Sequence, residues 1–286
     1  MANMDDLKLL PDDQEAREWI YKAKANGFML FYDYNNDFEN VELVENSADS
    51  ILKKAKLRPL QKVVTLSRSK FNPQYSLRHV LLEVQKLRRV SAHDNVLSYI
   101  GLTLTQESNV DNIVTVVLDY ADDNLRDYLS SSELSWDEKF KLAKQLTGGL
   151  YCIHQYDMFH GNLLHNFGKF KKIEESKKTL AQYFESIPYL DPQHLKNPKE
   201  FMRDEIISDI YSLGVLFWEI SSQKIPFEEF SNEPCKLCYL IVYENHRENS
   251  VPDTPKFYED LYKGNNFLNT YKYIHLINNH INDNNS

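Results

Sequence analysis

Two long stretches of the chain carry apolar residues at the spacing of an amphipathic helix. In residues 75–90 and again in residues 136–154, apolar side chains recur every three or four positions, which places them on one helical face. Gly148-Gly149 weakens the second helix locally, by about 1 kcal/mol for each glycine. The apolar positions are Leu77, Val80, Leu81, Val84 and Leu87 in the first helix, and Phe140, Leu142, Ala143, Leu146, Leu150 and Ile153 in the second.

A shorter helix is predicted near the N-terminus. Asp12 or Asp13 caps its start, it continues to Ala23, and Asn26-Gly27 ends it. An aromatic run, residues 28–34, follows. At the other end of the chain, apolar residues at helical spacing predict a last helix from Tyr271 to Ile281, before an asparagine-rich tail.

Strands are predicted between the N-terminal helix and the helix of residues 75–90, and again after the latter. Residues 38–44, 62–67 and 113–121 are rich in β-branched and aromatic residues, as strands are. The predicted strands therefore lie in the first part of the chain, and the predicted long helices dominate the second.

Composition fits a soluble globular protein of one large domain or two small ones. The 286 residues are 42% hydrophobic and 26% charged, and no run approaches the roughly 18 apolar residues of a membrane span. The start of the chain has no secretory pattern, and three cysteines suit a reducing compartment better than a disulfide framework. We therefore expect a cytoplasmic protein that does not bind membranes.

The net charge of −9 is unevenly distributed. Residues 1–50 hold 12 acidic and 4 basic groups, whereas residues 51–90 hold 11 basic groups and 1 acidic group. The two segments could attract a charged partner or fold against each other. The simplest explanation is that they form solvated surfaces of opposite charge. The basic segment has few aromatic residues, so we do not expect nucleic-acid binding by base stacking.

Three motifs resemble those of protein kinases. His160-Gly161-Asn162-Leu163 resembles H-R-D-L, and Asn166-Phe167-Gly168 resembles D-F-G. The longest match is Ser208–Ile220, which resembles the S-D-[VI]-[YW]-S-[LF]-G-[VI] helix of the large kinase lobe. The chain is thereby identified as similar to protein kinases of the tyrosine-kinase-like group.

This resemblance implies an α+β fold of two lobes, with a small β-rich N-lobe and a larger helical C-lobe. The boundaries that follow are residues 1–37 for an N-terminal helical extension, 38–121 for the N-lobe and hinge, 122–264 for the C-lobe, and 265–286 for an asparagine-rich C-terminal segment. The strand pair that separates the H-R-D and D-F-G motifs in kinases has no counterpart here. Five residues after Asn162 the chain reaches Phe167, which already belongs to the second motif.

The catalytic positions are degenerate by the same comparison. Asn162 stands where the aspartate that accepts the substrate proton is expected, and an amide has no lone pair basic enough for that task. Asn166 replaces the magnesium-binding aspartate of D-F-G. Ser67 replaces the strand lysine that pairs with the phosphates, so Glu83, the helix residue that binds this lysine in active kinases, lacks its usual partner. It is then solvated or paired with Arg68 or with Lys70.

The phosphate-binding loop is also altered. Its three glycines correspond to Glu45, Ser47 and Ser50, and the carboxylates of Glu45 and Asp49 repel a triphosphate. On strand spacing, Arg68 points to the opposite face from Ser67. A cradled nucleotide is therefore not expected.

Some positions keep a family role. Backbone groups at Asp119 and Ala121 form the hinge that would contact an adenine, whatever the side chains are. Asp209 matches the aspartate that supports the catalytic-loop backbone, a structural role. Gln193 replaces a buried glutamate whose arginine partner is also missing, which predicts a charge-free arrangement.

Three functions remain open on these residues. The first is a pseudokinase that acts as a signalling scaffold or allosteric regulator, with other signalling proteins or an active kinase as partners. The second is a residual protein kinase that uses ATP and magnesium, and the third is a truncated copy without function. No cofactor is expected except in the second. No metal site is expected, because Cys235-x-x-Cys238 has no second pair and only His246 as a further ligand.

Overall fold

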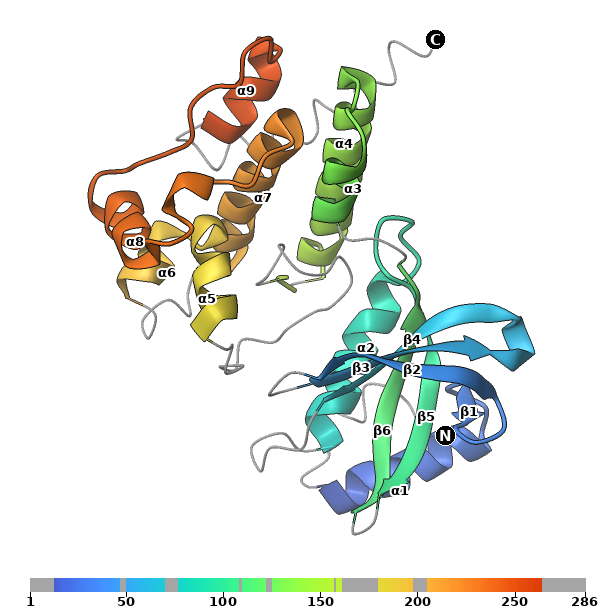
Figure 1. Ribbon diagram of the computed structural model, residues 1–286. Helices are drawn as coiled ribbons and strands as arrows, with labels where there is room; N and C mark the ends of the chain where they lie inside the picture. The colour runs from blue at the N-terminus through green and yellow to red at the C-terminus, as the bar shows by residue number, and fades with distance from the viewer. Residues whose placement is uncertain are drawn as a thin grey trace. The chain divides into compact units, whose positions relative to one another are not determined.

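The computed structural model describes residues 13–46, 50–69, 77–107, 110–121, 125–156, 158–160, 180–197 and 205–263 (Figure 1). These residues divide into two compact units, a first that ends at Ala121 and a second that begins at Leu125. The first is built on a β-sheet and the second on helices. An α+β fold with a β-rich N-lobe and a helical C-lobe, as expected from the sequence, is thereby confirmed.

The first unit contains a sheet of six strands in the order β1-β5-β6-β4-β3-β2. β1 runs parallel to β5, and all the other neighbours are antiparallel. The aromatic run 28–34 thus supplies a strand of this sheet, which the sequence patterns did not predict. The strands are β1 (Phe31–Asp33), β2 (Phe38–Asn46), β3 (Ser50–Leu57), β4 (Lys62–Ser69), β5 (Tyr99–Glu107) and β6 (Val110–Asp119).

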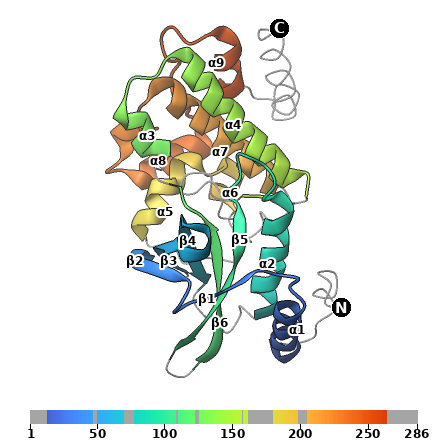
Figure 2. The same ribbon diagram turned by 90° about the vertical axis from the view of Figure 1, so that its right-hand side faces the viewer.

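Two helices cover one face of this sheet, which we call the α2 face. Helix α2 (Leu77–Val90) lies against β5 and β6, and α1 (Asp13–Ala25) packs on α2 (Figure 2). Their apolar side chains form one buried cluster with Leu102 and Val114 of the sheet. The predicted amphipathic stripe of α2 is therefore confirmed.

Helix α1 ends as its sequence predicts. Gly27 adopts a left-handed backbone with φ of +63°, which glycine adopts at little cost. The amide of Phe28 donates to the carbonyl of Ala23 at 3.0 Å, and the amide of Gly27 donates to Lys24 at 3.2 Å. These two bonds satisfy carbonyls that the helix end leaves open, and the chain turns directly into the sheet.

The opposite face of the sheet, which we call the far face, has its own core. Leu66 of β4 and Val117 of β6 are buried there with Phe38, and the rings of Tyr32 and Tyr34 pack against this cluster. Side chains alternate between the faces along each strand, so neighbours of these residues point toward the α2 face.

The second unit is built around α7, which packs against α4 and α9 (Figure 1). Ser135 and Glu138 form a capping box at the start of α4, so this helix begins at the residue where the sequence predicted it. The ring of Tyr258 is fully buried between α4 and α7 side chains. The helices of this unit are α3 (Leu125–Ser131), α4 (Trp136–His154), α5 (Leu180–Ser186), α6 (Pro192–Lys196), α7 (Glu205–Ser222), α8 (Pro234–Tyr243) and α9 (Lys256–Lys263). It also contains the short 3-10 turns η3 (Ile187–Tyr189) and η4 (Glu228–Phe230), and a third such turn, η2 (Arg58–Leu60), belongs to the sheet unit.

The helix predicted for residues 271–281 lies outside the described residues. Within the described ranges, none of the helices has both the length and the apolar character needed to cross a membrane.

Candidate functional site

Strand β4 places Ser67 on the α2 face. Its Cα pairs with Leu52 of β3 and with Val116 of β6, and Val116 packs against the cluster that α2 covers. The sequence comparison expects the phosphate-binding lysine at this position. A hydroxyl carries no charge and ends close to the strand, so this position offers a nucleotide no long cationic side chain.

Glu83 lies on α2 and is half-buried. Glu83 has at least one polar or electrostatic interaction in the structure, although position 67 is a serine and not a lysine. Arg68 follows Ser67 on β4 but lines a pocket together with Leu66, on the far face. Strand alternation predicted this orientation, and Lys70 lies outside the described residues.

The loop that corresponds to the phosphate cradle is shorter than the sequence suggested. Glu45 still belongs to β2, where it pairs with Leu52, and Ser50 already begins β3. Only residues 47–49 separate the two strands, and these, Ser47 and Asp49 among them, lie outside the described residues.

The hinge position Asp119 ends β6 and uses several of its polar groups within the sheet unit. Its amide donates to the carbonyl of Ser98 at 2.9 Å. Its carboxylate accepts from the amide of Tyr120 at 2.8 Å and binds Lys62 Nζ at 2.7 Å. The amide of Asp119 is therefore occupied, while Ala121 is exposed.

Helix α7 holds the start of the His160–Leu163 motif. Asp209 is 1% exposed, and its Oδ2 accepts a hydrogen bond from the backbone amide of His160 at 2.6 Å. The same oxygen lies 2.9 Å from Nε2 of His154 at the end of α4. Residues 161–170 lie outside the described residues, so the expected roles of Asn162 and Asn166 stay predictions.

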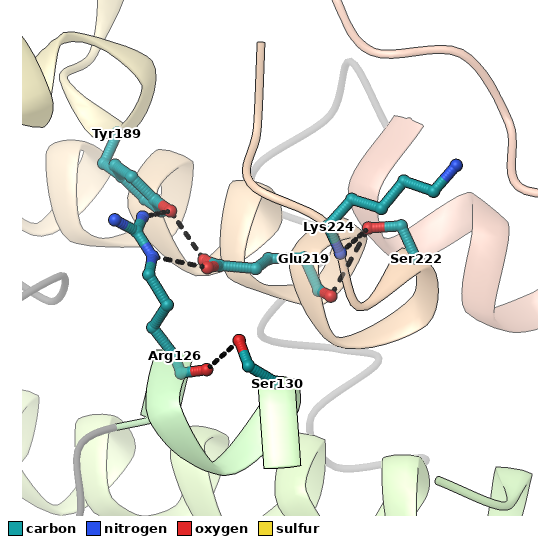
Figure 3. A network of polar contacts seen from close by, with 6 residues as sticks. All are labelled: Arg126, Ser130, Tyr189, Glu219, Ser222 and Lys224. Carbon is teal, nitrogen blue, oxygen red and sulfur yellow. Dashed lines mark hydrogen bonds and ion pairs between the residues drawn. The ribbon is translucent and has the colours of Figure 1, made fainter. Parts of the chain in front are cut away.

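A polar triad of the buried Glu219 and Tyr189 with the half-buried Arg126 joins three segments of the helical unit (Figure 3). Arg126 of α3 donates through Nε to Glu219 Oε1 at 3.2 Å and through a terminal nitrogen to the hydroxyl of Tyr189 at 2.9 Å. That hydroxyl donates to Glu219 Oε2 at 2.6 Å. The triad connects α3, the η3 turn and α7.

The environment of the triad shifts the pKa values of its members. Burial raises the pKa of Glu219, although Tyr189 and Arg126 act against the shift. Burial and the neighbouring Glu219 also raise the pKa of Tyr189. For Arg126, burial disfavours the charge, but Tyr189 and Glu219 outweigh it and raise its pKa.

No pattern in the sequence predicts this triad. Glu219 was visible as a lone acid in the apolar run 213–220, which indicates a buried charge in need of a partner. Its partner Arg126 lies 93 residues away in the chain, and no local pattern links the two.

Another prediction about the helical unit is wrong. Gln193, expected to fill a buried position without charge, is exposed. The buried group nearby is Asp191, which is 4% exposed and accepts from the amide of Gln193 at 2.7 Å. Burial raises the pKa of Asp191, and the charge of Arg247, which lies over the ring of Tyr211, is among the effects that oppose the shift. This region therefore contains a buried ionisable group, at Asp191 and not at Gln193.

The possible metal ligands are not gathered in one place. Cys235 is exposed and Cys238 is half-buried on α8, and both are free thiols. In the ranges that the structure describes, no three residues among histidine, cysteine, aspartate and glutamate are grouped so that they hold a metal ion.

Comparison with known proteins identifies the fold. The family model of the protein kinase domain matches residues 51–282, which is most of the chain. The chain belongs to the protein kinase domain family.

Individual relatives are distant. The mouse mixed lineage kinase domain-like protein is 26% identical over 63% of this chain and 41% of its own length. The human protein of the same description is 25% identical over 60% of this chain and 40% of its own. The wall-associated receptor kinase 2 of Arabidopsis thaliana is 25% identical over 71% of this chain and 30% of its own. The chain thus spans less than half of the length of these relatives.

Proposed function

We propose that this kinase domain is a pseudokinase of the tyrosine-kinase-like group, which acts as a signalling scaffold or allosteric regulator. Its partners would be other signalling proteins, including an active kinase. Ser67 carries the proposal, because it stands on the α2 face at the lysine position and is neutral. Asn162 and Asn166 extend the same loss of charge to the base and to a magnesium ligand.

The missing groups act together in phosphoryl transfer. The lysine and the magnesium ions neutralise charge on the phosphates, and the catalytic aspartate orients the attacking hydroxyl. Removal of one member of such a set costs several orders of magnitude in rate, and further losses add little because the set already fails. Three neutral replacements therefore favour a role in binding over a role in catalysis.

The helical unit supports a folded binding module. Asp209 fixes the backbone at His160, and the Arg126–Tyr189–Glu219 triad fixes α3 and η3 on α7. Neither arrangement needs a nucleotide. Two of the relatives are described as kinase domain-like, which fits the proposal. A cytoplasmic location, where Cys152, Cys235 and Cys238 stay reduced, belongs to the same proposal.

A phosphotransfer assay tests the proposal. The purified chain is incubated with γ-labelled ATP, magnesium and a general acceptor protein, beside an Asn162→Ala variant. We expect equal background incorporation from both, since Asn162 supplies no base. Incorporation by the native chain that the variant loses would overturn the proposal in favour of a residual kinase with ATP and magnesium.

A further inference from the structure

A pocket of about 620 Å³ opens in the sheet unit at the edge strand β1, where the far face of the sheet meets α1. Ser67 is not among the residues that line it. The volume lies in the range of small-ligand sites. Its walls come from α1, β1 and the turn after β1, and its floor comes from β3, β4, β5 and β6. The floor includes the buried side chains of Leu66 and Thr115, so a ligand in this pocket would contact the sheet itself.

The pocket carries a net positive charge. Lys24, Lys53 and Arg68 line it from three different elements, and Asp33 is the one acidic residue among the lining side chains. The Oδ1 atom of Asp33 already accepts the amides of Asn35 and Asn36, at 2.9 and 3.0 Å. Three cations thus face one carboxylate that the chain itself engages.

The two lysines are held by aromatic groups. Lys53 Nζ donates to the hydroxyl of Tyr34 at 3.1 Å and lies 5.6 Å from the centre of that ring. Lys24 Nζ lies 6.0 Å from the centre of the Phe31 ring. In the described part of the chain, neither ammonium group is in an ion pair. The charge of Lys24 does act on Asp33, whose pKa it helps to lower. An anion that enters would therefore meet two ammonium groups without breaking an ion pair.

Four aromatic side chains also line the pocket. Tyr21, Phe31, Tyr32 and Tyr34 all line the pocket. Tyr32 and Tyr34 are fixed by Phe38, with ring centres 6.2 and 6.1 Å away. Fixed rings offer stacking and edge contacts to a flat ligand at little cost in side-chain entropy.

This pocket is separate from the face where the family binds nucleotide. Lys53 and Lys54 are neighbours on β3, and strand alternation sends them to opposite faces. Lys53 lines the pocket, while Lys54 Nζ lies 4.3 Å from the centre of the Tyr120 ring at the hinge. Substitution of Lys53 therefore tests the pocket, and substitution of Lys54 tests the opposite face of the sheet.

We propose that this pocket binds a small aromatic anion of the aryl phosphate class. The phosphate would bind between Lys53, Lys24 and Arg68, and the ring would pack against Tyr32 and Tyr34. β1, which supplies much of the wall, is also the strand that the sequence patterns failed to predict. The inference does not depend on the loss of catalysis, because Ser67 and Asp119 are not part of this pocket.

The test is a calorimetric titration of the full chain with phenyl phosphate, inorganic phosphate and benzyl alcohol. We expect phenyl phosphate to bind more tightly than either of the other two, because only it carries both the ring and the charge. Lys53→Gln removes a charge-assisted hydrogen bond and should weaken binding by about tenfold. Lys54→Gln, the matched control on the same strand, should bind like the native chain.

Lys24→Gln gives a second variant on an exposed position, in case Lys53→Gln disturbs the sheet. It should also weaken phenyl phosphate, with an unchanged unfolding midpoint in the absence of ligand. No binding by the native chain at millimolar concentration would overturn the proposal. So would equal affinity for phenyl phosphate and inorganic phosphate, or a loss of binding in Lys54→Gln alone, which would place the ligand on the α2 face.

Discussion

The two units of this domain differ in the charge and the hydrogen bonding of their polar side chains. In the sheet unit, the α2 face carries the neutral Ser67 at the lysine position, and the hinge residue Asp119 is bound to Lys62 and Ser98. In the helical unit, Asp209 and Glu219 are buried, charged in type and hydrogen-bonded. The position at which the sequence motifs place a nucleotide-contacting lysine is neutral, whereas the groups that fix the chain to α7 are present.

The difference indicates that this domain relies on its polar groups for structure. A buried carboxylate is costly unless it is paired, so its partners keep it in place regardless of catalysis. A serine at position 67 brings no charge into the sheet unit and needs no such partner.

The largest expected effect comes from Asp209→Ala. The substitution removes the carboxylate oxygen that accepts from the amide of His160 and lies 2.9 Å from the ring of His154. We expect a loss of about 3 kcal/mol or more in the stability of the helical unit. Hydrogen exchange followed by mass spectrometry reads this in peptides of α4 and α7, separately from the sheet unit.

Asp253→Asn is the matched control, at an exposed residue with a φ of 61° that asparagine tolerates. It should change stability by less than about 0.5 kcal/mol. Equal effects of the two substitutions would show that the buried carboxylate is not what fixes His160 to α7.

Much of this arrangement follows from the sequence, and the exceptions share a cause. The spacing of apolar residues predicts α2 and α4, and motif order places Ser67 and Asp209. The patterns miss β1, because three residues are too few to show a period and its partner strand begins 68 residues later. They also miss the pairing of Arg126 with Glu219, which depends on how α3 and α7 pack.

Glycine-to-alanine substitutions at two positions give the next largest effect. They should change the free energy of unfolding in opposite directions in the two units. A Cβ at Gly101 would lie 2.7 Å from Cε2 of Tyr32 and 2.8 Å from the carbonyl of Leu30, so Gly101→Ala must displace β1. We expect a loss of about 1–3 kcal/mol in the sheet unit.

Gly214 lies inside α7, and no described atom would come within 4 Å of a Cβ there. Gly214→Ala should therefore stabilise the helical unit by about 0.5–1 kcal/mol, because alanine loses less backbone entropy in a helix. Urea unfolding of both variants measures the two changes. If Gly101→Ala were neutral, β1 would not be packed on β5 as described.

The smallest effect concerns pH. Hydrogen bonds from Lys263, Ser250 and Lys256 lower the pKa of Glu259 to about 2. A lowered pKa gives stability that is present above the ordinary value of 4.5 and is lost as the pH falls toward 2. The difference in unfolding midpoint between the native chain and Glu259→Gln should therefore shrink over that interval.

High salt should shrink the same difference at neutral pH, because it screens surface charges. A difference that is constant with pH would contradict the assignment of these hydrogen bonds to the ionised carboxylate of Glu259.

The most direct test of the central claim is thermal unfolding of the purified chain alone, with ATP, and with ATP and magnesium. A ligand that binds only the folded state raises the midpoint by mass action. We predict a cooperative transition whose midpoint is the same in all three conditions, because Ser67, Asn162 and Asn166 leave the phosphates and the metal without charged partners. A rise in midpoint that requires both ATP and magnesium would contradict that claim and would restore the residual kinase as the function to test.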